Sequence, residues 1–317
     1  MKLRAWQKAC VESALYSYSR KRHFLCLATP GAGKTTMAAE LAARLLENGD
    51  IDFVLCFAPS VAVTSGLQNT FQRRLKKRFD GRIGAVGGAY TYQSMRTISE
   101  EFWGLFDSHR VLVVFDEIHH CAGSDQGGVN SWGEEILVRI QHKAALTLAL
   151  TGTPWRSDKR PIVLAEYTDP AGEIQCDYIY GLREAVLDSV CRKPSIVLID
   201  NDRVALNNAK EQSVYSCLHE LFVKSDVRYQ QLLHDSDALG FCLSLACAQL
   251  DKLRDANPDA GGLVVASSIA HAEKIAGMLR DDFGKSAIVV TYKHKNAGMI
   301  IDNYRRGTQE WIVSVGM

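Results

Sequence analysis

Short apolar runs alternate with longer mixed stretches along the first half of the chain. Runs rich in Val, Ile, Leu and Phe, of which 111–115 is the clearest, are typical of strands buried on both faces of a parallel sheet. The stretches between them have helical composition, and Asn48-Gly49 is a pair that ends a helix. Strands that alternate with helices predict a parallel α/β sheet. The predicted strands are 24–28, 53–58, 111–115 and 146–150, and the predicted helices are 10–20, 36–47, 64–78 and 132–142.

The same pattern predicts a second α/β domain after an irregular region that contains several prolines. The boundary is placed between residues 185 and 186, so that the two domains are 1–185 and 186–317. A strand is expected at 195–199 and mainly helix over 205–256. Because the sequence stops at Met317, directly after an apolar run, the second sheet is expected to be incomplete. The later predicted strands are 263–266, 287–290 and 311–315, and the helices are 269–281 and 296–306.

Length and composition fit a globular chain of about two domains. The 317 residues are 47% hydrophobic and 23% charged, which excludes a mainly disordered or collagen-like chain. The nine cysteines are odd in number and form no Cys-x-x-Cys pair, which argues against a disulfide framework or a zinc ribbon. No apolar run approaches the ~20 residues of a membrane-spanning helix, and the N-terminus lacks the apolar core of a signal peptide. The expected location is the cytoplasm, without a membrane partner.

The net charge of +1 conceals an uneven distribution. Residues 1–160 carry +6 (21 Lys and Arg against 15 Asp and Glu), and residues 161–317 carry −5 (16 against 21). A basic half is compatible with a polyanion as partner. The basic run 73–78, on a predicted helix, is a candidate phosphate contact, although such runs are more often solvated helix faces.

Residues 28–35 read Ala-Thr-Pro-Gly-Ala-Gly-Lys-Thr and form a glycine-rich loop between a predicted strand and a predicted helix. Gly31 and Gly33 allow backbone N–H groups to approach phosphate oxygens, and the helix directs its positive end to the same place. Lys34, expected to be exposed, should reach the β- and γ-phosphates of a nucleotide, and Thr35 should ligate Mg²⁺. The predicted nucleotide-binding residues here are Pro30, Gly31, Ala32, Gly33, Lys34, Thr35 and Thr36.

Two carboxylates, Asp116 and Glu117, directly follow the apolar run 111–115. Open α/β sheets bind ligands at the carboxyl ends of their strands. Asp116 is therefore the expected partner of the Mg²⁺ held by Thr35, which makes these two the predicted metal site. Glu117 is the expected base, or orienting group, for an attacking water. Lys34, Asp116 and Glu117 are the predicted catalytic residues.

These motifs resemble those of superfamily 2 helicases with a DEAD or DEAH box. The clearest matches are a D-E-x-H box at 116–119 and, at 151–154, the S/T-A/G-T-P motif that follows it in the family. The resemblance covers nearly the whole chain, is most specific up to Trp155, and is strongest to the restriction-enzyme and DNA-repair branch. Further matches are Leu3-Arg4-Ala5-Trp6-Gln7 to the L-R-x-x-Q element, Thr91-Tyr92-Gln93-Ser94 to the T-Y-Q-S element, and Ala58-Pro59-Ser60 to the A/V-P-T/S element.

The resemblance implies a role for each matched residue. Gln7, with Arg4 beside it, would read the adenine of ATP; the alternative for Gln7 is an ordinary position on a surface helix. His119 would couple the nucleotide site to Thr151 and Thr153. The residues implied to contact the nucleic-acid strand are Pro59, Thr91, Tyr92 and Gln93, and the alternative for Tyr92 and Gln93 is a packed loop.

The resemblance also sets an expectation for the C-terminal part. Residues 261–268 resemble the element that opens the second motor domain, and 311–317 resemble the start of the next motif. The arginine-bearing final motif of the family, Q-x-x-G-R-x-x-R, is not in the sequence, and Arg305 and Arg306 do not match it. Residues 1–317 alone are therefore expected to bind ATP·Mg²⁺ but to hydrolyse it slowly, unless a protein partner supplies the missing motifs.

The combined expectation is an α/β protein with two RecA-like P-loop domains and mainly parallel sheets. It would act as an ATP- and Mg²⁺-dependent helicase or translocase on nucleic acid, with DNA favoured over RNA. The alternative is a nucleotide-binding fragment or regulatory module with little turnover, because the arginine motif is missing. An unrelated P-loop phosphotransferase is disfavoured by the Thr-Gly-Thr-Pro element at 151–154.

Overall fold

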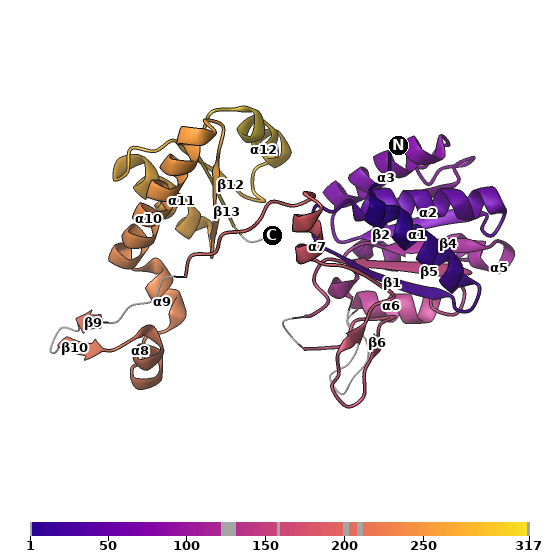
Figure 1. The fold of residues 1–317 in the computed structure, drawn as a ribbon, viewed down its shortest axis with the longest axis horizontal. Helices are drawn as coiled ribbons and strands as arrows, with labels where there is room; N and C mark the ends of the chain where they lie inside the picture. Colours follow the sequence, from indigo (N-terminus) through magenta and orange to yellow (C-terminus); the bar gives the residue numbers. More distant parts are fainter. Residues whose placement is uncertain (1, 122–130, 157–158, 199–202, 208–211, 316–317) are drawn as a thin grey trace. The chain divides into compact units, whose positions relative to one another are not determined.

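The computed structural model describes residues 2–121, 131–156, 159–198, 203–207 and 212–315. The chain divides into two compact units, unit 1 (Met1–Ser195) and unit 2 (Ile196–Met317) (Figure 1). The division lies further along the chain than the predicted 185/186. Helix α7 (Leu182–Leu187) spans that predicted position, and its Ala185 is buried in the core of unit 1.

Unit 1 is built on a six-stranded, entirely parallel sheet with the order β3-β2-β4-β5-β1-β8. The four predicted strands of this unit are all present, as β1, β2, β4 and β5. Two further strands, β3 and β8, extend the sheet at its two edges. The strands are β1 (His23–Ala28), β2 (Phe53–Ala58), β3 (Gly87–Thr91), β4 (Val111–Phe115), β5 (Leu146–Thr151) and β8 (Tyr178–Tyr180).

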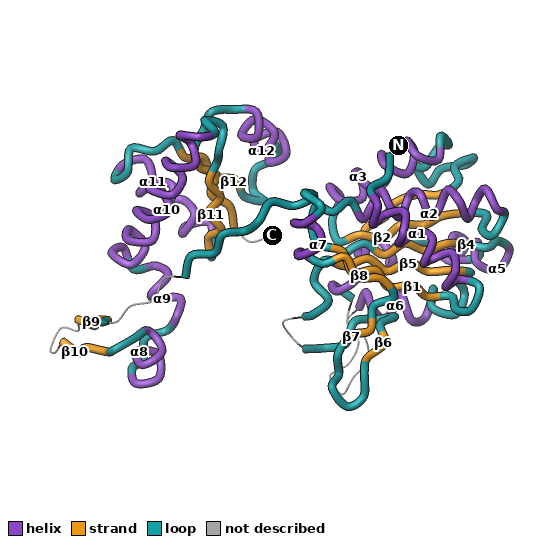
Figure 2. The backbone as a smooth tube through the Cα atoms, in the orientation of Figure 1, coloured by secondary structure: helices purple, strands orange, loops and turns teal. Residues whose placement is uncertain are grey.

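Helices cover both faces of this sheet, which explains why its strands are apolar throughout (Figure 2). On β4, Leu112 and Val114 join the core that includes α1–α3, whereas Val111, Val113 and Phe115 join the core on the other face. The helices are α1 (Ala5–Tyr18), α2 (Lys34–Asn48), α3 (Val61–Leu75), α4 (Glu100–Trp103), α5 (Leu105–Ser108) and α6 (Ser131–Arg139), with 3₁₀ turns η1 (Tyr92–Arg96) and η2 (Ile118–His120). A small antiparallel hairpin joins β6 (Glu166–Tyr167) to β7 (Ile174–Gln175).

The strand order brings three loops together at one edge of the sheet. β5 pairs with β1 on one side and with β4 on the other, and all three strands are parallel. Their carboxyl ends are therefore neighbours. These ends carry the glycine-rich loop 28–35, the Thr-Gly-Thr-Pro element 151–154 and the Asp116-Glu117 pair.

Unit 2 contains a small, three-stranded parallel sheet of order β11-β13-β12. Its strands and the helices α11 and α12 lie where the sequence predicts them. The elements are the hairpin β9 (Val204–Asn207) and β10 (Gln212–Tyr215), α8 (Leu218–Lys224), α9 (Tyr229–His234), α10 (Ser236–Ala256), β11 (Gly262–Ala266), α11 (Ile269–Asp281), β12 (Ala287–Val290), α12 (Ala297–Arg306) and β13 (Trp311–Val315). None of the helices described in either unit has the length and apolar character needed to cross a bilayer.

One prediction at the start of unit 2 is wrong. The described part of the expected strand 195–199 is not a strand, and the side chains of residues 196–198 are between 73% and 89% exposed. An apolar run becomes a strand only where a second strand pairs with it. The expected mainly helical stretch 205–256 is confirmed from Leu218 onward, where α8, α9 and α10 follow one another, and the antiparallel β9–β10 hairpin precedes them.

Candidate nucleotide-binding site

The loop between β1 and α2 has a backbone that requires glycine at two positions. Gly31 and Gly33 have φ values of 77° and 96°, in the left-handed region that other residues rarely adopt. Gly33 is the N-cap of α2, so the first N–H groups of this helix face the loop. A Cβ atom at Gly33 would lie 2.8 Å from Gln7 Nε2, so glycine is needed there for space as well. The loop can therefore present backbone donors to an anion.

Arg4 and Gln7 hold this loop through its carbonyl groups. Arg4 Nη1 donates to the carbonyl of Ala32 at 2.6 Å, and Gln7 Nε2 donates to that of Gly33 at 2.9 Å. Gln7 Oε1 accepts the backbone N–H of Arg4 at 2.8 Å, at the start of α1, and Gln7 is only 3% exposed. The Gln7 amide thus already has partners in the protein, and its reading of adenine stays a prediction.

Lys34, in the first turn of α2, is buried and makes an ion pair with Glu117. Its Nζ lies 3.2 Å from Glu117 Oε1 and 3.2 Å from the carbonyl oxygen of Ala28. Only 8% of Lys34 is exposed, so the expectation of an exposed lysine is wrong. The carboxylate at the end of β4 covers the ammonium group, and this contact links the loop after β1 to the loop after β4.

Asp116 is the more buried carboxylate of the pair, with 6% of its surface exposed. Its Oδ1 has no hydrogen-bond partner among the described residues. Burial and the negative charge of Glu117 raise the pKa of Asp116 to about 6, and the charge of Lys34 acts in the opposite direction. An unsatisfied buried carboxylate oxygen fits a hydrated divalent cation, and the half-buried Thr35 supplies a hydroxyl in the first turn of α2.

Glu117 is held on its second side by the loop after β5. It has a left-handed φ of 53°, and its Oε2 accepts the backbone N–H of Gly152 at 3.3 Å. A Cβ atom at Gly152 would lie 3.0 Å from Pro30 Cδ and 3.3 Å from Lys34 Nζ. Gly152 therefore lets three loops meet, a role that the sequence analysis did not assign, although the residue lies inside a recognised motif.

His119, Thr151 and Thr153 form a hydrogen-bonded cluster beside Glu117. His119 Nδ1 lies 3.0 Å from Thr151 Oγ1, 3.3 Å from Thr153 Oγ1 and 3.4 Å from Glu117 Oε2. Burial lowers the pKa of His119, and the neighbouring His120 acts in the same direction. The backbone carbonyl of His119 accepts a hydrogen bond from Arg156 Nη1 at 2.5 Å. Arg156 was not singled out from the sequence, although it follows the Thr-Gly-Thr-Pro element closely.

The position of Tyr92 favours the packed-loop alternative over the implied contact with a nucleic-acid strand. Its side chain is fully buried, its ring stacks on Trp132, and its hydroxyl donates to the carbonyl of Asp116 at 2.8 Å. Tyr92 therefore supports the acidic strand end from the core. Gln93, by contrast, is exposed, and its Nε2 lies 3.4 Å from the carbonyl oxygen of Pro59. The half-buried Thr91 caps η1 by accepting the N–H of Ser94.

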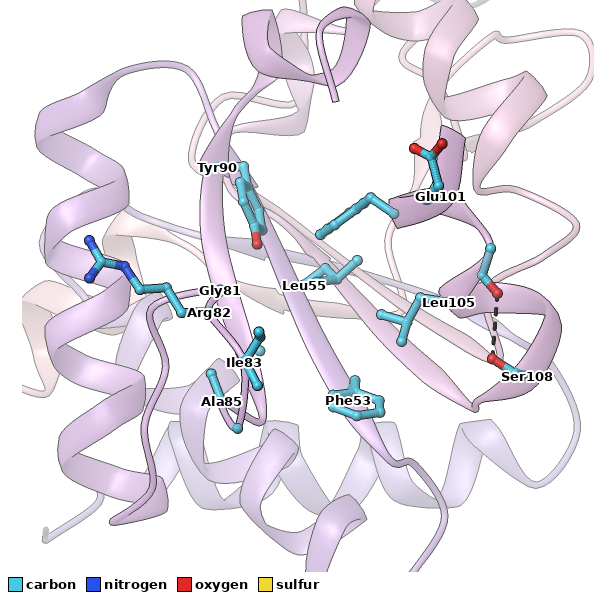
Figure 3. Close-up of a pocket in the computed structure, with 14 residues that line it drawn as sticks. Phe53, Leu55, Gly81, Arg82, Ile83, Ala85, Tyr90, Glu101, Leu105 and Ser108 are labelled. Atoms are coloured by element: carbon cyan, nitrogen blue, oxygen red, sulfur yellow. Dashed lines mark hydrogen bonds between the residues drawn. The ribbon is translucent and has the colours of Figure 1, made fainter. Parts of the chain in front are cut away.

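A separate cavity of about 560 Å³ opens beside the edge strand β3 (Figure 3). Phe53, Leu55 and Tyr90 line it from the sheet, and Arg82 and Ile83 line it from the loop that precedes β3. It contains none of the motif residues described above. The candidate nucleotide site is therefore the cluster of loops after β1, β4 and β5, not this cavity.

Residues 1–156 match the family model described as "Type III restriction enzyme, res subunit". A protein of Mycobacterium leprae (strain TN), itself uncharacterised, is 28% identical over 335 residues, which cover 99% of this chain and 54% of that protein. A second one, from Mycobacterium tuberculosis (strain ATCC 25618 / H37Rv), is also 28% identical and is covered to 53%. The chain spans about half the length of the curated relatives it matches.

Solved structures share the fold along nearly all of this chain. The ATP-dependent Type ISP restriction-modification enzyme LlaBIII, bound to DNA, has a TM-score of 0.62 and 15% identity, over 99% of this chain and 24% of that one. A fragment assigned to the HsdR subunit of a type I restriction enzyme from Vibrio vulnificus YJ016 has a TM-score of 0.60 and 17% identity, over 99% and 54%. At such identities the likeness shows the fold. Together with the family match over residues 1–156, it confirms the resemblance of this chain to superfamily 2 helicases of the restriction-enzyme branch.

Proposed function

We propose that this chain is the motor part of an ATP-dependent nucleic-acid translocase or helicase that acts on DNA. The observation that carries this proposal is the convergence of the loops after β1, β4 and β5, in which Lys34 Nζ lies 3.2 Å from Glu117 Oε1. A phosphate-binding lysine beside a carboxylate at a strand end is the arrangement that nucleotide hydrolysis needs. The LlaBIII enzyme, whose fold is similar, is described as ATP-dependent and bound to DNA, which supports ATP and DNA as ligands here.

Nucleotide binding exchanges the partner of Lys34. The β- and γ-phosphates compete for its ammonium group, which in this structure contacts Glu117. The carboxylate released in this way remains hydrogen-bonded to the N–H of Gly152. Glu117 then orients the attacking water and accepts its proton. The Lys34–Glu117 pair thus keeps the base occupied until phosphate arrives.

Thr35 and Asp116 would hold the Mg²⁺ that accompanies ATP. The unsatisfied buried oxygen of Asp116 and the hydroxyl of Thr35 are suitable oxygen donors. When the cation is bound, it neutralises part of the negative charge of the phosphates. The protein contributes the buried position of Asp116, which Tyr92 supports through its hydrogen bond to the Asp116 carbonyl.

His119 is proposed to transmit a change in the position of Glu117 to the loop at the end of β5. It lies within hydrogen-bonding distance of Thr151 and Thr153 and 3.4 Å from Glu117. A displacement of the carboxylate changes the hydrogen bonds open to His119, and with them the position of the Thr-Gly-Thr-Pro loop. Differential contacts of this kind are what conformational coupling requires. The exposed Gln93, with Pro59 and Thr91 beside it, is proposed to meet the nucleic-acid strand.

Phosphate release from ATP, measured with and without nucleic acid, tests this function. Release by these 317 residues should be slow, as expected for a sequence without the arginine-bearing motif, but it should be faster when single- or double-stranded DNA is added than when RNA of the same length is added. The Lys34→Ala variant should show no stimulated release. ATP binding without release under any of these conditions would instead identify a nucleotide-binding module and contradict the motor function.

A further inference from the structure

A pocket of about 410 Å³ lies between the segment that follows the Thr-Gly-Thr-Pro element and the β6–β7 hairpin. The segment contributes Trp155 and three cationic residues, and the hairpin contributes Tyr167. The hydroxyl of Tyr167 accepts the backbone N–H of Ile162 at 2.7 Å, which fixes its ring in the pocket wall. The described residues that line the pocket are Pro154, Trp155, Arg156, Lys159, Arg160, Pro161, Ile162, Tyr167, Gly172 and Ile174.

The chemistry of this lining is cationic and aromatic. Arg156, Lys159 and Arg160 are basic, and no Asp or Glu occurs among the lining residues that the structure describes. Trp155 is 67% exposed, whereas Trp6, Trp103 and Trp311 are at most 4% exposed. Proteins that bind single-stranded nucleic acid combine an exposed aromatic ring with nearby basic groups. Bases stack on the ring, and phosphates contact the cations.

We propose that this pocket binds one or two nucleotides of a single-stranded nucleic acid. A base stacks on Trp155, and the adjoining phosphates contact Lys159 and Arg160. The volume suits a unit of this size, since ligand pockets generally begin at about 300 Å³. The inference rests on the proposed function, which it extends by a strand contact outside the motifs recognised in the sequence.

Arg156 connects this pocket to the nucleotide site. It lines the pocket, and its Nη1 donates to the backbone carbonyl of His119, whose ring lies 3.4 Å from Glu117. A phosphate that draws the Arg156 guanidinium toward the pocket weakens its bond to His119. Occupation of the pocket by a strand therefore acts on the group that contacts the catalytic carboxylate.

Fluorescence anisotropy of labelled oligonucleotides, with nucleotide absent, measures the binding directly. We expect Trp155→Ala to weaken binding of a dT oligonucleotide by about 5- to 150-fold, the range for loss of one stacked base. Trp155→Phe, which keeps a ring, should restore most of the affinity. The double variant Lys159→Gln/Arg160→Gln should lower the slope of log K against log salt by about 1.4, for two phosphate contacts to a single strand.

Two exposed residues of α1 provide matched controls. Tyr16→Ala removes an aromatic ring that is 64% exposed, and Lys8→Gln removes an exposed charge. Neither should change oligonucleotide affinity. Wild-type tryptophan fluorescence should also be quenched on binding, and this quenching should be absent in Trp155→Phe. An rU oligonucleotide in parallel reports whether the pocket takes RNA as well.

ATP affinity, measured with a fluorescent analogue in the same proteins, separates this inference from the proposed function. Loss of oligonucleotide affinity with unchanged ATP affinity in Trp155→Ala supports the pocket. Equal oligonucleotide affinity in Trp155→Ala and wild type, or no binding by the wild type, overturns it even where ATP binds. Displacement of the oligonucleotide by micromolar AMP assigns the pocket to free nucleotides and also overturns it. If the wild-type chain binds no ATP, the proposed function is contradicted. The anisotropy measurements then still show whether the pocket binds a single strand.

Discussion

Lys34 Nζ lies 3.2 Å from Glu117 Oε1, so the lysine proposed to bind phosphate and the candidate base form an ion pair. The two side chains reach this contact from the carboxyl ends of β1 and β4, with β5 between these strands. Glu117 is 28% exposed at its side chain and Lys34 9%, so the pair is partly shielded from water. Under the proposed function, phosphate binding would replace Glu117 by the phosphate as the anion that contacts Lys34. Each residue can be tested by removing its partner.

Lys34→Ala should abolish nucleotide binding and reduce turnover by about 10² or more, because a cation that meets the phosphates is lost. The variant should also lose about 1–2 kcal/mol of unfolding free energy, since Glu117 is left unpaired in a partly buried position. Titration with a fluorescent nucleotide and urea denaturation measure the two effects. Lys8→Ala, an exposed position on α1, is the control. Unchanged affinity and turnover in Lys34→Ala would remove the loop 28–35 from the nucleotide site.

The Glu117→Gln variant should still bind ATP, but its rate of ATP hydrolysis should fall by a factor of about 10² or more. The amide oxygen can still accept the N–H of Gly152, so the loop after β5 keeps its position. The amide cannot accept the proton of water, and without its charge Lys34 becomes more available to phosphate. Single-turnover hydrolysis and nucleotide affinity measured together check this. Hydrolysis at the wild-type rate would show that another group is the base.

Gly152→Ala should weaken ATP binding, because the new Cβ atom would lie 3.0 Å from Pro30 Cδ and 3.3 Å from Lys34 Nζ. Overpacking of this kind costs about 1–3 kcal/mol and displaces the phosphate loop. Gly66→Ala is the matched control, since a Cβ atom there meets nothing within 4 Å and the residue lies inside α3. That variant should be neutral or about 0.5–1 kcal/mol more stable. A Gly152→Ala protein with normal ATP affinity would show that the three loops are more loosely packed than described.

The Gln7→Ala variant should bind both ATP and GTP more weakly, because the hydrogen bond from Gln7 Nε2 to the carbonyl of Gly33 shapes the loop for any nucleotide. A larger loss of affinity for ATP than for GTP would show that Gln7 recognises adenine, as the family resemblance implies. Competition titrations with both nucleotides give the two losses separately. An equal loss of affinity for both nucleotides would mean that Gln7 only holds the loop in place. No loss for either nucleotide would argue against both roles, loop support and adenine recognition.

Glu40→Gln should destabilise the protein at pH 7 and much less at pH 3.5. Glu40, on α2, accepts hydrogen bonds from Arg74 Nε at 2.6 Å and Arg44 Nε at 3.3 Å. The bond from Arg74, against the opposing effect of burial, holds the pKa of Glu40 below its usual 4.5. A lowered folded-state pKa stabilises the protein above pH 4.5, and this stabilisation is lost as the pH falls through the folded-state value.

The expected difference between wild type and Glu40→Gln is about 1–3 kcal/mol at pH 7, the range for hydrogen bonds to charged groups. Urea denaturation at both pH values measures it, and the exposed Asp107→Asn is the control. An equal difference at both pH values would mean that packing rather than charge links α2 to α3. Because Arg74 has this structural partner, only part of the basic run 73–78 remains available to phosphates.

Every strand of the two parallel sheets except β3 and β8 could be predicted, because each is an apolar run between polar or glycine-containing loops. The edge strand β3 could not, since it begins with Gly87-Gly88, and glycine disfavours strands. It forms because it pairs with β2, and glycine is needed at this point since a Cβ atom at Gly87 would lie only 1.9 Å from the carbonyl oxygen of Val54. The apolar residues 196–198 show the reverse case, since composition there predicts a strand that tertiary pairing does not provide.

The candidate site could be predicted as a set of residue types but not as a set of contacts. Glycine, lysine and carboxylate spacing points to the loop 28–35 and to Asp116 and Glu117. The burial of Lys34 and of Tyr92 depends on residues far away in the sequence, so no local pattern reveals it. The same holds for Gln7, whose amide is committed to the Gly33 carbonyl by the packing of α1 beside the loop.

The position of β5 between β1 and β4 has a thermodynamic consequence. The three loops of the site come from widely separated parts of the sequence and meet only when all three strands have paired. An unfolded or partly paired chain therefore cannot assemble the site, and a nucleotide that binds it binds the native state alone. By linkage, nucleotide at 100 times its dissociation constant should add about 2.7 kcal/mol to the unfolding free energy of unit 1. The melting temperature of this unit is thus a readout of site occupancy, even for variants that no longer turn over.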